Sequence, residues 1–195
     1  RSVDVAIEFS SPEAAFENVC KCLEAGKPVV SGTTAWLKDY GKAVEICKKN
    51  NTSFIQSSNF SVGVNLFFHI NRELAMRIKD YPDYKVSIEE IHHTKKLDAP
   101  SGTAITTADR ISEGHGSYSG WSMSDKPEDG KIPVTAIREG NVPGTHIVNW
   151  DSDIDTITLS HVAKNRKGFA LGAVIAAEFI QKRKGVFTMS DVLGF

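Results

Sequence analysis

The side chains best suited to chemistry stand together between residues 89 and 104, which read Glu-Glu-Ile-His-His-Thr-Lys-Lys-Leu-Asp-Ala-Pro-Ser-Gly-Thr-Ala. Histidine gains and loses a proton near neutral pH, and lysine adds positive charge and a transferable proton. Ser101, Gly102 and Thr103 resemble the opening turn of a helix with Ser101 as its cap. The free amides and positive dipole end of such a turn bind anions. The segment therefore predicts a pocket for a small carboxylate or phosphate compound, with a proton donor beside it.

The two neighbouring histidines do not predict a metal site. Side chains alternate between the faces of a strand, so His92 shares a face with Glu90 while His93 points the other way. A zinc site needs imidazoles that converge with a third ligand. We therefore expect no metal here.

Each feature of this segment alone has a simpler structural explanation. A histidine pair can mark a solvated strand edge, paired lysines mark an exposed loop, and Ser-Gly-Thr at a helix start is ordinary capping. Their occurrence within a dozen residues favours a functional site.

Strands and helices alternate in the first part of the chain, which predicts a parallel sheet built from βαβ units. Strands are expected over residues 3–9, 27–32 and 53–57. Their carboxyl ends are small, hydroxyl-bearing or glycine-containing turns at residues 9–11, 32–34 and 57–60. Ligands of open parallel sheets bind at these ends.

The pattern changes after Asn59. A long helix is expected from Val62 to Tyr81, and an apolar helix from Phe169 to Lys184 closes the chain. Between them, strands are expected over 85–93, 131–138, 144–151 and 155–163, largely antiparallel, and a loop over 111–130. We predict an α/β protein with a discontinuous Rossmann-like domain (1–60 and 166–195) and an inserted α+β domain (61–165) with a mixed or antiparallel sheet.

Composition narrows the class of protein. The chain has 195 residues, 41% of them hydrophobic, and a net charge of −1, which is typical of a globular protein. Near-neutral charge argues against broad nucleic-acid or anionic-membrane surfaces, and no run approaches the about 20 apolar residues of a membrane span. Cys20 and Cys47 lie on predicted buried helix faces, which favours reduced thiols and a cytoplasmic protein. Because a strand pattern begins almost at Arg1, we expect a longer parent chain.

The string from Glu90 to Ala104 resembles the Glu-x-His-His-x-x-Lys-x-Asp-x-Pro-Ser-Gly-Thr-Ala signature of the 4-hydroxy-tetrahydrodipicolinate reductase (dihydrodipicolinate reductase) family of lysine biosynthesis. Further segments resemble the family in the same order: residues 9–13, 32–34, 59–65, 138–140, 144–146 and 166–173. The resemblance covers nearly the whole chain.

This resemblance implies hydride transfer from NADH or NADPH to the ring of a dicarboxylate, which yields tetrahydrodipicolinate. By position, His92 matches the family's catalytic histidine and Lys96 its proton donor. Substrate-carboxylate contacts are matched by His93, Gly102 and Thr103. Cofactor contacts are matched by Gly32, Thr33, Thr34, Ser57, Ser58, Asn59, Phe60 and Arg166. Relatives commonly form homotetramers through the sheet of the second domain, so we expect the same.

One departure from the family leaves two alternatives open. Relatives carry a strand and a glycine-rich turn before the segment that starts at Phe9, and that stretch would also indicate NAD or NADP. Ser57 and Ser58 stand where alanines are common. The alternatives are a truncated, non-catalytic anion-binding or assembly module, which intact mass would identify, and a related aspartate or homoserine dehydrogenase. The His-His-x-x-Lys string argues against the latter.

Overall fold

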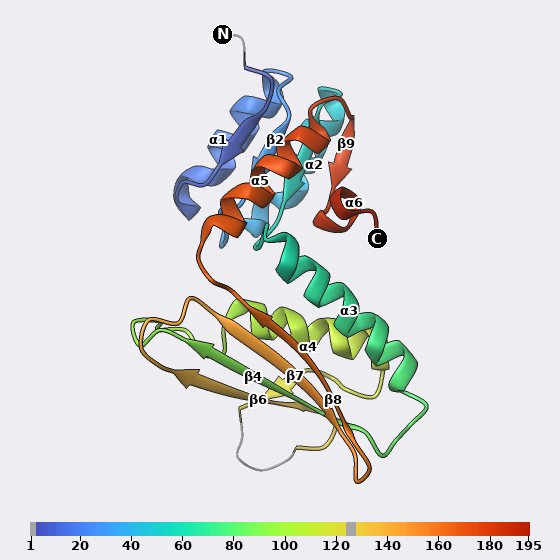
Figure 1. The fold of residues 1–195 in the computed structure, drawn as a ribbon. Coiled ribbons are helices and arrows are strands. Elements are labelled where there is room, and N and C mark those ends of the chain that lie inside the picture. Colours follow the sequence, from blue (N-terminus) through green and yellow to red (C-terminus); the bar gives the residue numbers. More distant parts are fainter. Residues whose placement is uncertain (1–2, 124–127) are drawn as a thin grey trace. The chain divides into compact units, whose positions relative to one another are not determined.

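The computed structural model describes residues 3–123 and 128–195. The chain forms two compact units (Figure 1). Unit 1 comprises Arg1–Asn65 and Lys167–Phe195, and unit 2 comprises Leu66–Arg166. The first unit is therefore assembled from both ends of the chain. None of the described helices is long and apolar enough to cross a membrane.

Unit 1 is built on a parallel sheet, as predicted. Its strands are β1 (Ala6–Glu8), β2 (Val29–Ser31), β3 (Ser53–Gln56) and β9 (Gly185–Phe187), in that order across the sheet. The helices are α1 (Pro12–Glu24), α2 (Tyr40–Lys49) after the 3-10 turn η1 (Leu37–Asp39), α5 (Lys167–Ile180) and α6 (Met189–Leu193). The sequence pattern predicts neither β9 nor α6, which are only three and five residues long. The predicted helix runs to Lys184, but α5 ends at Ile180.

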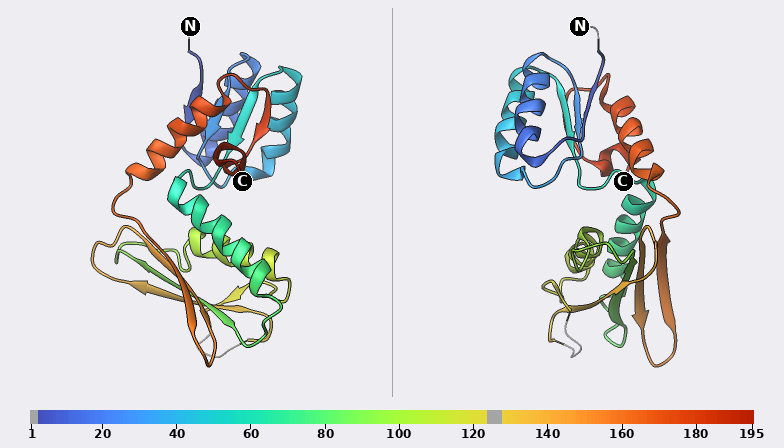
Figure 2. Two further views of the ribbon diagram at one scale, coloured as in Figure 1. Left: turned by 45° about the vertical axis from the view of Figure 1, so that its right-hand side comes forward. Right: turned by 90° about the vertical axis from the view of Figure 1, so that its left-hand side faces the viewer.

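Two cores cover the two faces of this sheet. Val29 and Phe54 pack against α1 and α2, whereas the next residues, Val30 and Ile55, pack against α5 (Figure 2). Alternate strand residues thus bury on opposite faces, as expected for a parallel sheet covered on both sides. Pro12 begins α1 directly after Ser11, a position that suits the fixed φ of proline.

Gly172 lets α5 lie directly against the turn that follows β3. A Cβ atom at this position would lie 1.7 Å from the carbonyl oxygen of Phe60. The Phe60 ring is itself in the core and only 1% exposed. The backbone of this turn is therefore fixed by helix packing, while the Phe60 side chain is unavailable to a ligand.

Unit 2 is built on a five-stranded mixed sheet. Its order is β5 (Trp121–Ser122), β6 (Ile132–Arg138), β4 (Lys85–His92), β7 (Thr145–Asp151) and β8 (Thr156–Val162). The pairings β4–β7 and β7–β8 are antiparallel, but β4–β6 and β5–β6 are parallel. The predicted mixed sheet is thus confirmed. The expectation that its strands are largely antiparallel is wrong, because the α4 connection (Gly102–His115) returns the chain parallel to β4.

Helices α3 (Val62–Ile78) and α4 lie on one face of this sheet (Figure 2). Strand β4 alternates in burial as predicted, and Val86, Ile88, Glu90 and His92 are its buried residues. Two of the four are ionisable. A strand that points a carboxylate and an imidazole inward must supply them with partners there.

The loop predicted over residues 111–130 is wrong in its first part, because α4 continues to His115, and at residues 121–122, which form β5 beside β6. In the sequence, Gly114 resembles a residue that ends a helix. A Cβ atom there would lie 2.5 Å from the carbonyl oxygen of Arg72 in α3, so the glycine serves a close helix contact. The helix ends two residues later, where Gly116 adopts a φ of 78°. Residues 124–127 of the predicted loop lie outside the described residues.

Candidate active site

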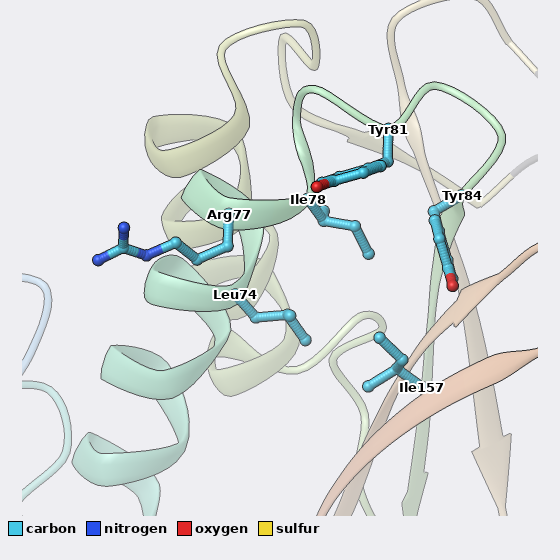
Figure 3. Close-up of a pocket in the computed structure, with 6 residues that line it drawn as sticks. All are labelled: Leu74, Arg77, Ile78, Tyr81, Tyr84 and Ile157. Carbon is cyan, nitrogen blue, oxygen red and sulfur yellow. The ribbon is translucent and has the colours of Figure 1, made fainter.

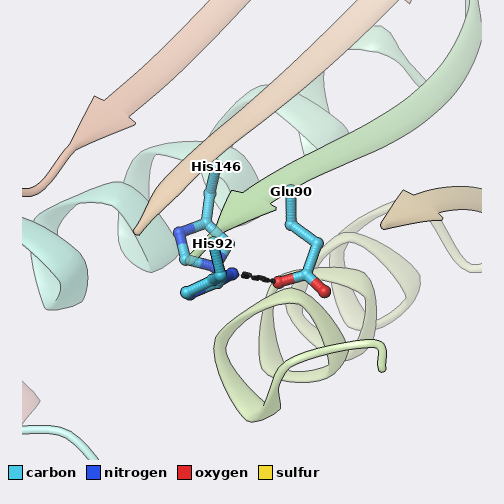
Figure 4. A group of neighbouring side chains, drawn as sticks. All are labelled: Glu90, His92 and His146. Carbon is cyan, nitrogen blue, oxygen red and sulfur yellow. Dashed lines mark ion pairs between the residues drawn. The ribbon is translucent and has the colours of Figure 1, made fainter. Parts of the chain in front are cut away.

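A buried carboxylate is the centre of the chemistry in unit 2. The Glu90 side chain is fully buried, and its Oε1 accepts hydrogen bonds from the amide of Ser101 at 3.0 Å and from Nη2 of Arg138 at 2.9 Å. Its Oε2 lies 2.7 Å from Nδ1 of His92 (Figure 4). Arg138 Nη2 also donates to the carbonyl of Asp98 at 2.7 Å. One carboxylate therefore joins β4, β6 and the start of α4.

Strand register assembles this group. Across the sheet, Glu90 stands opposite His146 of β7, and His92 stands opposite Arg138 of β6. The rings of His92 and His146 are 5.1 Å apart in an edge-on arrangement. His146 Nε2 lies 3.1 Å from the Ser101 hydroxyl. The three inward side chains and the helix cap form one connected polar network.

Burial and neighbouring charges set the protonation states in this network. Burial alone would raise the pKa of Glu90, but hydrogen bonds from Ser101 and Arg138 lower it overall, so the carboxylate is ionised at neutral pH. Burial lowers the pKa of His92, and Glu90 opposes that shift while Lys96 and Arg138 add to it. Burial is the main cause that lowers the pKa of His146 to about 4, and the charge of His92 is the second. Both imidazoles are therefore neutral at pH 7.

Helix α4 begins as the sequence predicts. Ser101 is its N-cap, and the hydroxyl accepts a hydrogen bond from the amide of Ala104 at 3.2 Å. Gly102 and Thr103 follow, and the first amides of a helix have no acceptor within it. A Cβ atom at Gly102 would have no heavy atom within 4 Å. The space beside Gly102 is therefore open, next to amides of a kind that bind anions.

Lys96 lies in the turn after β4, and its ammonium contacts both oxygens of Asp98 at 2.8 and 2.9 Å. The Lys96 side chain is 20% exposed. Its charge acts on His92, since it contributes to the lowered pKa of that ring. His93 donates its amide to the carbonyl of Val142 at 2.9 Å and is half-buried. The structure thus brings Lys96 and His92 into one electrostatic group.

Glu90, His92 and His146 bring ligand atoms within 4.8 Å of one another, and two imidazoles with a carboxylate are a donor set that zinc uses. The charge of Arg138 argues against a dication here. Its guanidinium already compensates Glu90 at 2.9 Å and would repel a second cation. We interpret the cluster as a hydrogen-bonded network.

The carboxyl ends of the strands in unit 1 are organised by another buried carboxylate, Glu8. Its Oε1 accepts from the amide of Ser10 at 2.8 Å and the Thr33 hydroxyl at 3.0 Å, and its Oε2 accepts from the Ser31 hydroxyl at 2.7 Å. Burial alone would raise the pKa of Glu8, but these hydrogen bonds lower it overall. The turns after β1 and β2 are therefore held by one ionised group.

The remaining predicted cofactor residues lie at these strand ends or at the edge of α5. Thr34 and Ser58 are exposed, Gly32 is half-buried, and Ser57 donates its hydroxyl to the carbonyl of Asn59 at 2.8 Å. Arg166 is exposed directly before α5.

A cavity of about 270 Å³ in unit 2 contains none of the predicted site residues (Figure 3). It is lined by Leu74, Arg77, Ile78, Tyr81, Tyr84 and Ile157. The mostly apolar lining offers no acid–base pair, in contrast to the Glu90 network.

The predicted site omitted four residues that the structure places in the two buried carboxylate networks: Glu8, Glu90, Arg138 and His146. The signal for Glu90 was present in the sequence, since a carboxylate on the apolar face of a strand requires partners. The contribution of His146 had no local signal, because it comes from a different strand.

Comparisons with known proteins agree across both units. Residues 1–60 match the family model described as dihydrodipicolinate reductase, N-terminus, and residues 63–193 match the one described as its C-terminus. The sequence is 56% identical to a 4-hydroxy-tetrahydrodipicolinate reductase of Christiangramia forsetii, over 98% of this chain and 80% of the relative. It is 40% identical to that of Methanosarcina acetivorans, over 98% and 73%.

Solved structures show the same similarity. A dipicolinate-bound dihydrodipicolinate reductase from Paenisporosarcina sp. TG-14 superposes with a TM-score of 0.79 at 26% identity, covering 95% of this chain and 71% of that one. A probable dehydrogenase from Thermotoga maritima, 12% identical, gives a TM-score of 0.58 over 98% and 74% and shares the fold.

Proposed function

The chain belongs to the dihydrodipicolinate reductase family, and from that premise we propose how its residues divide the reaction among them. The activity is the NAD(P)H-dependent reduction of 4-hydroxy-tetrahydrodipicolinate to tetrahydrodipicolinate in the diaminopimelate route to lysine. Nothing in the fold or the comparisons favours a non-catalytic module or another dehydrogenase.

The substrate carboxylates bind at the start of α4. Gly102 and Thr103 supply amides, and Lys96 and His93 supply nearby donors from the preceding turn. The observation that carries this proposal is the open, capped helix start joined through Glu90 to His92. Amides fixed in this way bind a carboxylate without reorganising.

Lys96 donates the proton that completes the reduction, and His92 assists it. The reduction replaces the 4-hydroxyl of the substrate by hydrogen, so this hydroxyl leaves as water. Hydride addition to the ring leaves electron density that a positioned acid must protonate. The ammonium of Lys96 is held by Asp98 at 2.8 Å, within electrostatic reach of the neutral His92 ring. A substrate carboxylate can compete with Asp98 for this ammonium because both are anionic acceptors.

The carboxyl ends of β1, β2 and β3 suit a dinucleotide, which supplies the hydride when bound. Exposed Thr34 and Ser58 are small enough to let a ring approach the backbone, and Glu8 fixes Thr33 beside them. The residues that would hold it are Gly32, Thr33, Thr34, Ser57, Ser58, Asn59, Phe60 and Arg166. Phe60 would act through its backbone, because its ring is buried.

Gly102→Ala tests the anion site. We expect it to weaken binding of pyridine-2,6-dicarboxylate by about ten- to a hundredfold, which corresponds to the loss of one charge-assisted hydrogen bond. The reason is that the methyl group would occupy the open space beside Gly102 that the ligand is proposed to use. Isothermal titration calorimetry measures the Kd. Gly41→Ala is the matched control, since a Cβ there also meets nothing within 4 Å. Unchanged affinity in Gly102→Ala would contradict the helix-start site.

We also propose that four copies of the chain assemble through unit 2 into a homotetramer. Among the described elements, α3 and α4 cover one face of the sheet (Figure 2). Most residues of β8 are exposed. Ile157 and Val162 of β8 are 38% and 59% exposed. Sedimentation equilibrium is expected to give four chains per particle. A monomer at micromolar concentration would contradict this assembly.

The cysteines support a cytoplasmic location. Cys20 and Cys47 are buried free thiols, as predicted, and Cys22 is also free. Proteins of oxidising compartments generally use such residues in disulfides.

A further inference from the structure

We propose that Glu90 is a positioning residue that selects the tautomer of His92 and ties this ring to the anion-binding end of α4. The proposal rests on the proposed role of His92. It assigns a function to a residue that does not itself touch the substrate.

The tautomer follows from what surrounds Nδ1 of His92. This atom lies 2.7 Å from Oε2 of Glu90, and among the described residues neither atom has another hydrogen-bond partner. An ionised carboxylate can only accept hydrogen bonds. A neutral His92 must therefore carry its proton on Nδ1, which leaves the lone pair on Nε2.

The surroundings of Nε2 are kept clear by Gly144. A Cβ atom at this position would lie 3.0 Å from Nε2 and 3.3 Å from Cδ2 of His92. Gly144 also has a φ of 154°. A side chain there would press on the nitrogen that the tautomer leaves basic. The Nε2 atom can then accept a hydrogen bond during proton transfer.

Glu90 cannot turn to release His92, because its other oxygen is held twice. Oε1 accepts from Ser101 N at 3.0 Å and from Arg138 at 2.9 Å. The same side chain therefore fixes the ring and the first turn of α4 in one rigid unit. A carboxylate that orients a histidine in this way is a recurring device of acid–base sites.

The Glu90→Gln variant distinguishes the orientation of the His92 ring from binding of the ligand. The two donors at Oε1 require the amide oxygen there, so the NH₂ group faces His92 and forces Nδ1 to become the acceptor. We expect the His92 ¹⁵N resonances to exchange their protonated and unprotonated positions. We expect kcat to fall by about 10²–10⁴-fold, the range of acid–base contributions, while the Kd for pyridine-2,6-dicarboxylate changes by less than about threefold.

The control is Glu89→Gln, on the adjacent half-buried position of β4, which should leave the tautomer and kcat unchanged. The wild-type spectrum is a second test that needs no variant, and an Nε2–H tautomer in it would overturn the proposal. Equal losses in kcat and ligand affinity would also overturn it, because they indicate a merely structural role. A His92→Gln variant with full activity would instead refute the proposed role of His92, whatever the tautomer.

Discussion

Lys96→Ala is expected to lower kcat by about 10²–10⁴-fold while KM changes far less. The reason is that the ammonium delivers the proton after hydride addition, an interaction that matters mainly in the transition state. The ammonium of Lys96 lies 2.8 Å from Asp98, and the Lys96 side chain is only 20% exposed. The ammonium is therefore held in a defined position. Steady-state kinetics with freshly prepared substrate measure both constants.

Lys95→Ala is the matched control for this experiment. Lys95 is adjacent, carries the same charge and is exposed, so its loss should leave kcat within about twofold. A rise in KM with an unchanged kcat in Lys96→Ala would reduce Lys96 to a binding residue. Unchanged constants in both variants would remove it from the site.

Arg138→Met is expected to destabilise unit 2 by about 3 kcal/mol, the lower end for breaking a buried ion pair, because Arg138 is one-fifth exposed. The substitution leaves the Glu90 carboxylate buried without its cation. Chemical denaturation at pH 7 measures the change in the free energy of unfolding. Arg110→Met is the control, since its pair with Glu113 is 46% and 49% exposed and should contribute less than about 1 kcal/mol.

The effect of Arg138 should depend on pH in a defined direction. The folded pKa of Glu90 is lowered from its ordinary value of 4.5, so its contribution to stability is present above that value and is lost as pH falls through the folded pKa. The stability difference between wild type and Arg138→Met should therefore shrink below about pH 4.5. A difference that stays constant from pH 7 to pH 3 would show that lost packing, not charge, causes it.

The local periodicities of the sequence determined much of this protein. Alternation placed Glu90 and His92 on one face of β4, and residue types after it predicted the capped start of α4 at Ser101. Strand–helix alternation predicted the parallel sheet of unit 1 and its hydroxyl-rich strand ends. These features depend on neighbours in sequence, which is why they can be derived from it.

Only the tertiary structure decided which partners meet the buried carboxylate. The predicted site residues did not include His146 and Arg138, yet His146 stands opposite Glu90 and Arg138 is its cation. Both come from strands that pair with β4, and one of these pairings is parallel where the sequence predicted a largely antiparallel sheet. Register between distant strands is set by the packing of the whole sheet, and a shift of one residue would turn His146 to the other face. No local pattern carries that information.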